Sequence, residues 1–421
     1  MPAFVFPGQG SQRPGMGRAW VDHPSWELVA DASEAASRDL EHLLLDAGQE
    51  ELTETRNAQL ATFTIGLLVL DAVERLGIEP TSCAGHSLGE YTALVAAGAL
   101  SFEDGVRVVT ERGEAMQAAA DARPGTMVLL DGCDDESARI ACRLADGAVW
   151  VANYNTPDEV VLAGEPAAVE RAAEIALGMA GGSAVGVAVG GAFHTPFMAP
   201  ARDRLRKALA ATTFHEPEVA VVANVDAMSH VSAAEWDALL RAQVVSPVRW
   251  HQSVLRLAGL APERPSERGT WAPERPSERG TGTGDAILGE RLFAEVGPGG
   301  SLSSMIRRTV PGVTTVAVAV PDDLDRLVDA VAGATALHAF AAGHQGEHLY
   351  VSERMVISPR AGVFEPAGGL DGGLVVEVGT LLGSVSGSEV RSAFAGTLMG
   401  MLAQAGERVQ TGQPIAWLRA M

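Results

Sequence analysis

The twenty residues at positions 81–100, TSCAGHSLGEYTALVAAGAL, limit the fold of this chain more than any other stretch. A short apolar run ends at Gly85, glycines lie two residues before and two residues after Ser87, and an alanine-rich stretch follows. Because glycine tolerates the backbone conformations of a tight turn, the pattern predicts a strand, a turn and a helix. A strand that passes directly into a helix is the unit from which sheets covered by helices are built. The chain is therefore expected to have an α/β fold.

The same alternation is expected on both sides of this unit. A buried strand over Ala3–Phe6 should end at Pro7, because proline cannot continue a central strand. The remaining patterns predict helices over 57–77, 102–121, 198–211 and near 233–256, a strand over 218–225, and a strand, glycine turn and helix over 291–308. Residues 1–125 and 194–318 are thus expected to form one large subdomain, followed by a helix and linker over 319–350.

Residues 126–193 have a different pattern. Residues 126–132, 149–164 and 183–189 are expected to form three strands, with helices over 135–146 and 165–180 between them. This order is typical of a small inserted α+β subdomain with antiparallel strands.

A tandem repeat interrupts the large subdomain, because APERPSERGT occurs at 261–270 and again at 272–281. A segment so rich in Pro, Glu, Arg, Ser and Gly cannot bury a core, so 261–284 is predicted to be a disordered surface insertion. The alternative is a binding repeat, but two copies are too few for a solenoid.

Composition excludes several classes of function. Hydrophobic residues make up 47% of the chain, which is normal for a globular protein. Acidic residues outnumber basic ones 53 to 31, and the net charge of −22 repels nucleic acid and anionic membranes. Three cysteines without CxxC spacing, and a beginning without a basic or long apolar segment, predict a cytoplasmic protein with no structural metal.

The turn at Ser87 is the best candidate for a reactive site. GHSLG has the GxSxG pattern of a nucleophile elbow, although a surface serine in a glycine loop is the alternative. A serine nucleophile needs a base, and the chain has ten histidines. His194, in GGAFHTPFM, is one candidate, and His86 is its rival although its side chain should leave the elbow in another direction. A histidine on the surface of a helix start is the third interpretation of His194.

Eight motifs in a fixed order resemble the malonyl-CoA:acyl carrier protein transacylases. They are FPGQGSQ (6–12), GHSLGEYTALVAAGAL (85–100), ERGEAMQ (111–117), ANYNTPDEVVLAG (152–164), GAFHTPFM (191–198), ANVDA (223–227), QVVSPVRW (243–250) and EVGPGGSLSSMIRR (295–308). The resemblance covers roughly residues 1–318. It implies an α/β-hydrolase-like parallel sheet with an inserted ferredoxin-like subdomain.

The resemblance also implies roles for individual residues. Ser87 would be the nucleophile and His194 its general base, oriented by the main-chain carbonyl of Gln243. The main-chain N–H groups of Gln9 and Leu88 would form the oxyanion hole, where negative charge develops during acyl transfer.

Three further residues would contact the substrate. Arg112 matches the arginine that binds the free malonyl carboxylate, and a guanidinium fork suits a carboxylate; a surface helix residue is the alternative. The bulk of Phe193 is similar to that in malonyl-selective enzymes, although packing would also explain it. Asn155 matches a motif that lines the cleft, and an Asx turn would explain it nearly as well.

Residues 351–421 are expected to form a separate small all-β module. VISPRAGVF (356–364) and SAFAGTLMGMLAQAGERVQTGQPIAWL (392–418) resemble a biotinyl/lipoyl carrier domain of the barrel-sandwich hybrid type. Such domains attach their cofactor to a lysine at a turn. Either that turn here reads SGSE (386–389), or WLRAM (417–421) starts the attachment motif and the lysine would follow Met421; Lys207 is the only lysine in the chain. No biotin, lipoate or other cofactor is therefore expected, and the module would serve docking or structure.

The expected function is transfer of a malonyl group from malonyl-CoA, through an acyl-serine intermediate, to the phosphopantetheine thiol of an acyl carrier protein in fatty acid or polyketide synthesis. The alternatives are transfer of another acyl group between carrier proteins, hydrolytic editing of acyl thioesters, and a non-catalytic assembly or docking protein.

Overall fold

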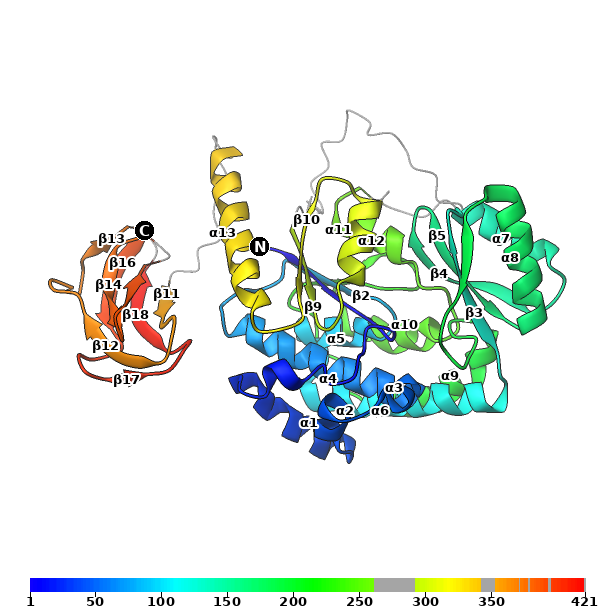
Figure 1. Ribbon diagram of the computed structural model, residues 1–421, viewed down its shortest axis with the longest axis horizontal. Helices are drawn as coiled ribbons and strands as arrows, with labels where there is room; N and C mark the ends of the chain where they lie inside the picture. The colour runs from blue at the N-terminus through cyan, green and yellow to red at the C-terminus, as the bar shows by residue number, and fades with distance from the viewer. Residues whose placement is uncertain (261–291, 342–352, 371, 378, 393–394, 420–421) are drawn as a thin grey trace. The chain divides into compact units, whose positions relative to one another are not determined.

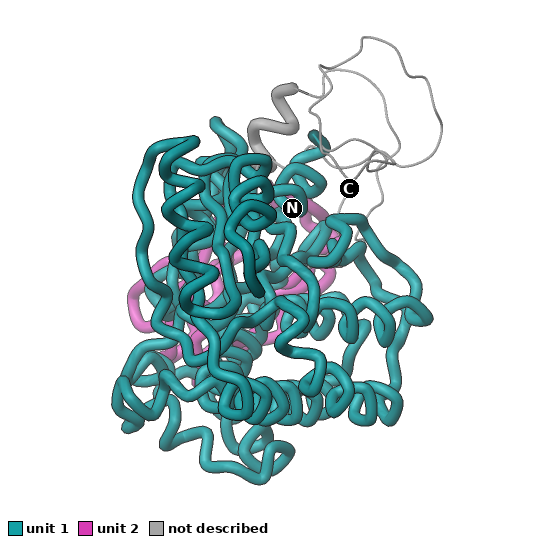
Figure 2. The backbone as a smooth tube through the Cα atoms, turned by 90° about the vertical axis from the view of Figure 1, so that its right-hand side faces the viewer, with its two compact units in different colours: residues 1–338 teal, residues 339–421 magenta. Residues whose placement is uncertain are grey.

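The computed structural model describes residues 1–260, 292–341, 353–370, 372–377, 379–392 and 395–419. The chain divides into two compact units, Met1–His338 and Ala339–Met421 (Figure 2). The tandem repeat predicted to be disordered, 261–284, lies outside the described residues, as does most of the linker that should follow the last helix of the first unit.

A six-stranded sheet forms the centre of the first unit (Figure 1). Its order is β10 (Thr314–Val318), β9 (Leu292–Val296), β1 (Ala3–Phe6), β2 (Ser82–Gly85), β7 (Ala220–Val222) and β8 (Ser229–His230). All pairs are parallel except β7 with β8. The predicted strands at 3–6 and after 81 are therefore neighbours, and the expected strand over 218–225 is shorter than its apolar pattern.

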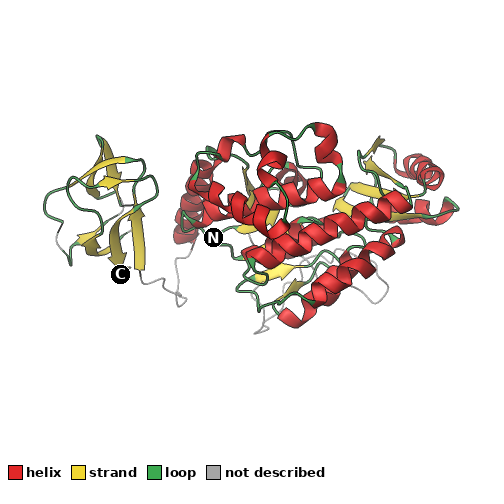
Figure 3. Ribbon diagram, turned by 90° about the horizontal axis from the view of Figure 1, so that it is seen from below, coloured by secondary structure: helices red, strands yellow, loops and turns green. Residues whose placement is uncertain are grey.

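Helices cover both faces of this sheet, as the alternation of strand and helix predicts (Figure 3). Outside the inserted subdomain, the α-helices described in this unit are α1 (Leu28–Ala36), α2 (Leu40–Leu45), α3 (Gln49–Thr53), α4 (Thr55–Glu74), α5 (Gly89–Ala96), α6 (Phe102–Ala122), α9 (Ala199–Ala210), α10 (Trp236–Gln243), α11 (Trp250–Leu257), α12 (Ser301–Thr309) and α13 (Asp323–Ala341). Phe4 and Phe6 of β1 share a core with α4–α6, whereas Ala3 and Val5 share one with α11 and α12. Alternate residues of a strand point to opposite faces, so one short strand joins two cores.

The inserted subdomain has four strands, so the prediction of three was wrong. The run 149–164 is a hairpin of β4 (Val149–Thr156) and β5 (Glu159–Gly164), and the sheet order is β4-β5-β3-β6, with β3 (Thr126–Asp131) and β6 (Ser183–Gly186), all antiparallel. Pro157 and Asp158 form the turn, and this residue pair favours chain reversal. Helices α7 (Asp135–Leu144) and α8 (Pro166–Ala180) bury their apolar sides against this sheet.

The second unit is built of strands and has its own core (Figure 3). Its strands are β11 (Glu353–Ile357), β12 (Gly362–Pro366), β13 (Val375–Val376), β14 (Leu381–Val385), β15 (Ser388–Arg391), β16 (Gly396–Met401), β17 (Arg408–Val409) and β18 (Pro414–Arg419). They form two four-stranded sheets, β11-β18-β16-β13 and β15-β14-β12-β17. Among the residues that the structure describes, no helix has the length and apolar character needed to cross a membrane.

Candidate active site

Ser87 lies on the turn between β2 and α5, where the sequence predicts it. Its φ of 53° is in the left-handed region, which a non-glycine residue enters only under constraint. The flanking glycines are required by space. A Cβ at Gly85 would lie 1.9 Å from the main-chain carbon of Gly89, and one at Gly89 would lie 2.0 Å from the Phe6 oxygen.

His194 is the histidine that the fold brings to Ser87. Its Nε2 lies 2.7 Å from Ser87 Oγ, and its Nδ1 lies 2.9 Å from the main-chain oxygen of Gln243. A carbonyl oxygen only accepts, so Nδ1 carries the proton and Nε2 is the acceptor that faces the hydroxyl. The rival, His86, turns away, and its Nε2 contacts Asn155 Oδ1 at 3.0 Å.

The surroundings of His194 keep it neutral. Its side chain is buried, and burial together with the nearby positive charge of Arg112 lowers the pKa of His194 to about 3. An imidazole without a proton on Nε2 can accept the hydroxyl proton of Ser87 at neutral pH. The interpretation of His194 as a surface residue is therefore wrong.

Arg112 is also buried, so the interpretation of it as a surface helix residue is wrong. Only 1% of it is exposed, and its Nη2 donates to Ser87 Oγ at 3.1 Å and to Gln243 Oε1 at 3.0 Å. Its Nη1 donates to Gln59 Oε1 at 2.6 Å. Its Nε is buried and has no hydrogen-bond partner in the described residues. A buried cation thus lies beside Ser87 Oγ, and its guanidinium carbon is 5.2 Å from the centroid of the Tyr91 ring.

Gln9 and Leu88 follow the ends of two neighbouring strands, β1 and β2. Phe6 pairs with Gly85 in these strands, so the two loops leave the sheet at the same level. Gly8 packs so closely on this turn that a Cβ would lie 2.4 Å from the His86 oxygen. Within the described part of the chain, the main-chain N–H groups of Gln9 and Leu88 donate to no acceptor.

The two remaining candidates have different surroundings. Phe193, 5% exposed, belongs to the large core and immediately precedes His194. Asn155 is not brought to Ser87: its amide lies between His86 and Glu159 Oε1, which accepts from Asn155 Nδ2 at 2.9 Å. Asn155 lies inside β4, so the Asx-turn interpretation is wrong.

Sequence reasoning missed two buried residues that hold the turn. Asn224 Oδ1 accepts the Ser87 N–H at 2.7 Å, and Asn224 Nδ2 donates to the Gly85 oxygen at 2.7 Å. Glu90 accepts the Asn224 N–H at 3.2 Å and a hydrogen bond from Gln243 Nε2. Both belong to the motifs quoted above, and a buried polar side chain needs partners, but the identity of the partners is set by the fold.

An ion cluster joins the inserted subdomain to the large one. Arg308 of α12 contacts Asp131 at 2.7 Å, Asp158 at 2.8 Å and Glu159 at 2.8 Å. Since Glu159 also binds Asn155, the contacts continue to His86, the neighbour of Ser87.

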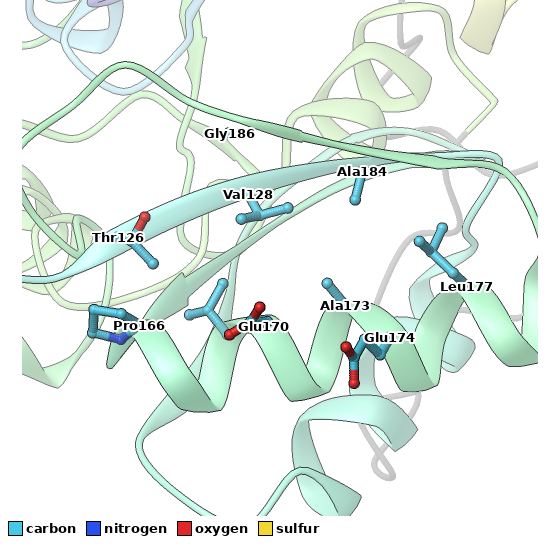
Figure 4. A pocket seen from close by; sticks show the side chains of 10 residues that line it. Thr126, Val128, Pro166, Glu170, Ala173, Glu174, Leu177, Ala184 and Gly186 are labelled. Carbon is cyan, nitrogen blue, oxygen red and sulfur yellow. The ribbon is translucent and has the colours of Figure 1, made fainter.

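A groove of about 500 Å³ lies elsewhere, between α8 and strands β3 and β6 (Figure 4). Its walls include Val128, Glu170 and Ala184, and none of its lining residues contacts the Ser87 group. The candidate active site is the buried polar group around Ser87, and this groove is not part of it.

Comparisons with known proteins identify the family of this chain. A family model described as the acyl transferase domain matches residues 3–264. A malonyl CoA-acyl carrier protein transacylase of Bacillus subtilis is 34% identical over 328 residues, which cover 77% of this chain and 95% of that protein.

Solved structures are similar as well. The malonyl-CoA:acyl carrier protein transacylase of Xanthomonas oryzae matches with a TM-score of 0.68 and 37% identity, covering 78% of this chain and 97% of that one. A malonyl-transacylase in complex with its type II PKS acyl-carrier protein matches with a TM-score of 0.67 and 33% identity, covering 78% of this chain and 99% of that one.

Proposed function

This chain belongs to the family of malonyl-CoA:acyl carrier protein transacylases, and we propose that Ser87, His194 and Arg112 perform its reaction. The enzyme transfers a malonyl group from CoA to an acyl carrier protein in fatty acid or polyketide synthesis. The observation that carries the residue assignment is that Ser87 Oγ lies 2.7 Å from His194 Nε2 and 3.1 Å from Arg112 Nη2.

The first half-reaction acylates Ser87. As Ser87 Oγ attacks the thioester carbonyl carbon, its proton passes to His194 Nε2, and the new imidazolium is held by the Gln243 carbonyl. The main-chain N–H groups of Gln9 and Leu88 would bind the negative oxygen of the tetrahedral intermediate. When the C–S bond breaks, the CoA sulfur leaves and takes the proton from His194.

The second half-reaction reverses these roles. His194 takes the proton of the phosphopantetheine thiol, and the sulfur attacks the ester carbonyl carbon of malonyl-Ser87. The bond between the carbonyl carbon and Ser87 Oγ breaks, and Oγ regains its proton from His194. The nucleophile, the base and the oxyanion donors all come from the chain, so we propose that transfer requires no metal or cofactor.

Arg112 would select a substrate with a free carboxylate. Its charge is buried and its Nε donor lacks a partner in the described residues, and both features favour binding of an anionic group. Phe193 and Leu88, each next to a catalytic residue, would disfavour a branched acyl group such as methylmalonyl. Asn155 would act indirectly, by holding His86.

We propose that the second unit is a relative of biotinyl/lipoyl carrier domains, that it serves docking or structure, and that residues 351–421, which include no lysine, carry no cofactor. Its hairpin β14–β15 turns at Ser386 and Gly387, both with positive φ, where a carrier domain would have a lysine.

The three cysteines are free, which supports the cytoplasm as the proposed location.

Intact-protein mass spectrometry after brief incubation with malonyl-, methylmalonyl- and acetyl-CoA tests the function. We expect a malonyl adduct on the native protein and none on Ser87→Ala. On Arg112→Ala we expect the ratio of acetyl adduct to malonyl adduct to be higher than on the native protein. A persistent adduct on Ser87→Ala would exclude Ser87 as the nucleophile. Absence of any adduct on the folded native protein would favour carrier-to-carrier transfer or a docking role, and rapid loss of the adduct to water would favour hydrolysis.

A further inference from the structure

Glu90 is a buried carboxyl group to which the reaction as described assigns no part. It lies in the first turn of α5, three residues after Ser87, and 1% of it is exposed. Its Oε1 accepts the main-chain N–H of Asn224 at 3.2 Å, and its Oε2 accepts from Gln243 Nε2. Both partners donate, so the ionised carboxylate, which only accepts, matches them.

Glu90 determines which way the Gln243 amide points. In the observed orientation Gln243 Nε2 donates to Glu90 and, at 2.8 Å, to the main-chain oxygen of Ser87. Gln243 Oε1 accepts from Arg112 at 3.0 Å. The opposite orientation would place the amide oxygen against two acceptors and the amide NH2 against a guanidinium. A carboxylate on one side and a cation on the other therefore fix the amide between them.

Gln243 connects this carboxylate to both reactive groups. Its side-chain oxygen binds Arg112 Nη2, and its main-chain oxygen binds His194 Nδ1 at 2.9 Å. The charge of Glu90 favours the cationic form of Arg112, and that of Arg112 favours the ionised form of Glu90, although burial raises the pKa of Glu90 to about 7. The carboxylate thus offsets part of the cost of a guanidinium that burial takes out of water.

We propose that Glu90 is a positioning residue: its carboxylate orients the Gln243 side chain, which holds Arg112 for the carboxylate of the substrate. The inference rests on the function proposed above, because only a substrate with a free carboxylate needs Arg112. An acetyl group lacks that carboxylate, so loss of Glu90 should impair malonyl transfer more than acetyl transfer.

The test compares the full-length native protein with Glu90→Gln, using kcat/KM for malonyl-CoA and for acetyl-CoA with the same acceptor thiol. A glutamine keeps the size of the side chain but has one acceptor oxygen, so one of the two donors then faces an NH2 group. We expect kcat/KM for malonyl-CoA to fall about 10- to 100-fold, the effect of losing a hydrogen bond to a charged group, and the malonyl-to-acetyl ratio to fall about tenfold.

Glu295→Gln is the matched control. Glu295 on β9 is fully buried, and it accepts the main-chain N–H groups of Gly300, Leu302 and Ser303 at 3.1, 3.2 and 2.7 Å. We expect both this variant and Glu90→Gln to lose stability, but only Glu295→Gln to keep the malonyl-to-acetyl ratio of the native protein. An equal change of ratio in both variants would mean that a buried glutamate acts only through general stability.

Gln243→Ala provides an independent variant and a double-mutant cycle. It removes the amide but keeps the main-chain oxygen that binds His194, so the malonyl-to-acetyl ratio should fall as in Glu90→Gln. The double variant should be no worse than the more impaired single variant, because both changes break the same chain of contacts. Additive losses would contradict the proposal, and if Glu90→Gln does not fold, an unchanged ratio in Gln243→Ala contradicts it alone.

The result with the native protein distinguishes failure of the proposed function from failure of the inference about Glu90. If it forms no malonyl adduct on Ser87, the proposed function fails. If it forms the adduct and Glu90→Gln has the native ratio, only the role of Glu90 fails.

Discussion

At the scale of single residues, this site combines backbone strain with burial. Ser87 and His194 both have a left-handed φ, of 53° and 59°, which costs about 1–2 kcal/mol for a residue with a Cβ. Asn224 holds the Ser87 N–H, and the Gln243 carbonyl holds the His194 ring. These hydrogen bonds maintain a conformation that directs Oγ and Nε2 at each other.

The lowered pKa of His194 has a consequence for the pH dependence of acylation. With its pKa at about 3, the imidazole stays neutral, and therefore basic, well below the ordinary value near 6.5. We expect single-turnover acylation of Ser87 by malonyl-CoA in Glu90→Gln to show no loss of rate centred at pH 6.5 between pH 5 and 8. The native protein is measured beside this variant, because the pKa of Glu90 is about 7 and protonation of Glu90 should lower the native rate as the pH falls through that value. A loss of acylation rate centred at pH 6.5 in both proteins would show that the pKa of His194 lies at its ordinary value.

At the scale of elements, the position of the site follows from two strand ends at one level. Phe6 pairs with Gly85, so the loop that carries Gln9 and the turn that carries Ser87 emerge side by side. The approach is so close that side chains are excluded at Gly85 and Gly89. The glycines of the turn are therefore needed for packing between elements as well as for the backbone of the turn itself.

Two glycine substitutions separate this packing from ordinary glycine flexibility. Gly85→Ala places a Cβ 1.9 Å from the main-chain carbon of Gly89, so we expect it to destabilise the fold by more than about 3 kcal/mol or to prevent folding. Gly178→Ala, on the exposed side of α8 with no atom near its Cβ, should stabilise the protein by about 0.5 kcal/mol. Denaturant unfolding of both variants measures the difference, and similar values for the two would refute the packing argument.

At the scale of the whole molecule, two units with separate cores divide the chain. The reactive group belongs wholly to Met1–His338, in which Arg308 connects the inserted subdomain to the rest. The Bacillus subtilis relative matches over 95% of its own length while covering 77% of this chain. Acyl transfer therefore should not depend on Ala339–Met421.

Removing residues 345–421 tests this division. We expect the shortened protein to keep a cooperative thermal transition and its rate of malonyl transfer to a small thiol, because the cores of the first unit are complete without the second. Calorimetry and the thiol assay measure both properties. Loss of the transition would mean that the second unit supports the fold, whereas a loss confined to transfer onto a carrier protein would indicate docking.

Local sequence pattern alone identified the elements that surround Ser87. The spacing of Gly85, Ser87 and Gly89 predicts the turn, and the apolar runs before and after it predict β2 and α5, because these features depend on neighbours in the chain. The short helices α1–α3 escaped prediction, since helices of five to nine residues present too few apolar positions for a clear period. The hairpin of 149–164 was missed because these residues were interpreted as one strand, although their polar middle, NTPDE (155–159), contains the turn pair Pro157 and Asp158.

Tertiary structure alone decided which residues meet. Residue reasoning left His86 and His194 as rival bases, and only the resemblance to a family favoured His194, which is 107 residues from Ser87 in the chain. No feature of the nearby sequence indicates that Arg112 is buried or that Asn155 contacts His86. The same holds for the contacts of Glu90 and Asn224. Contacts between distant residues depend on the register of strands and the packing of helices, whereas a sequence pattern records only which residues are near in the chain.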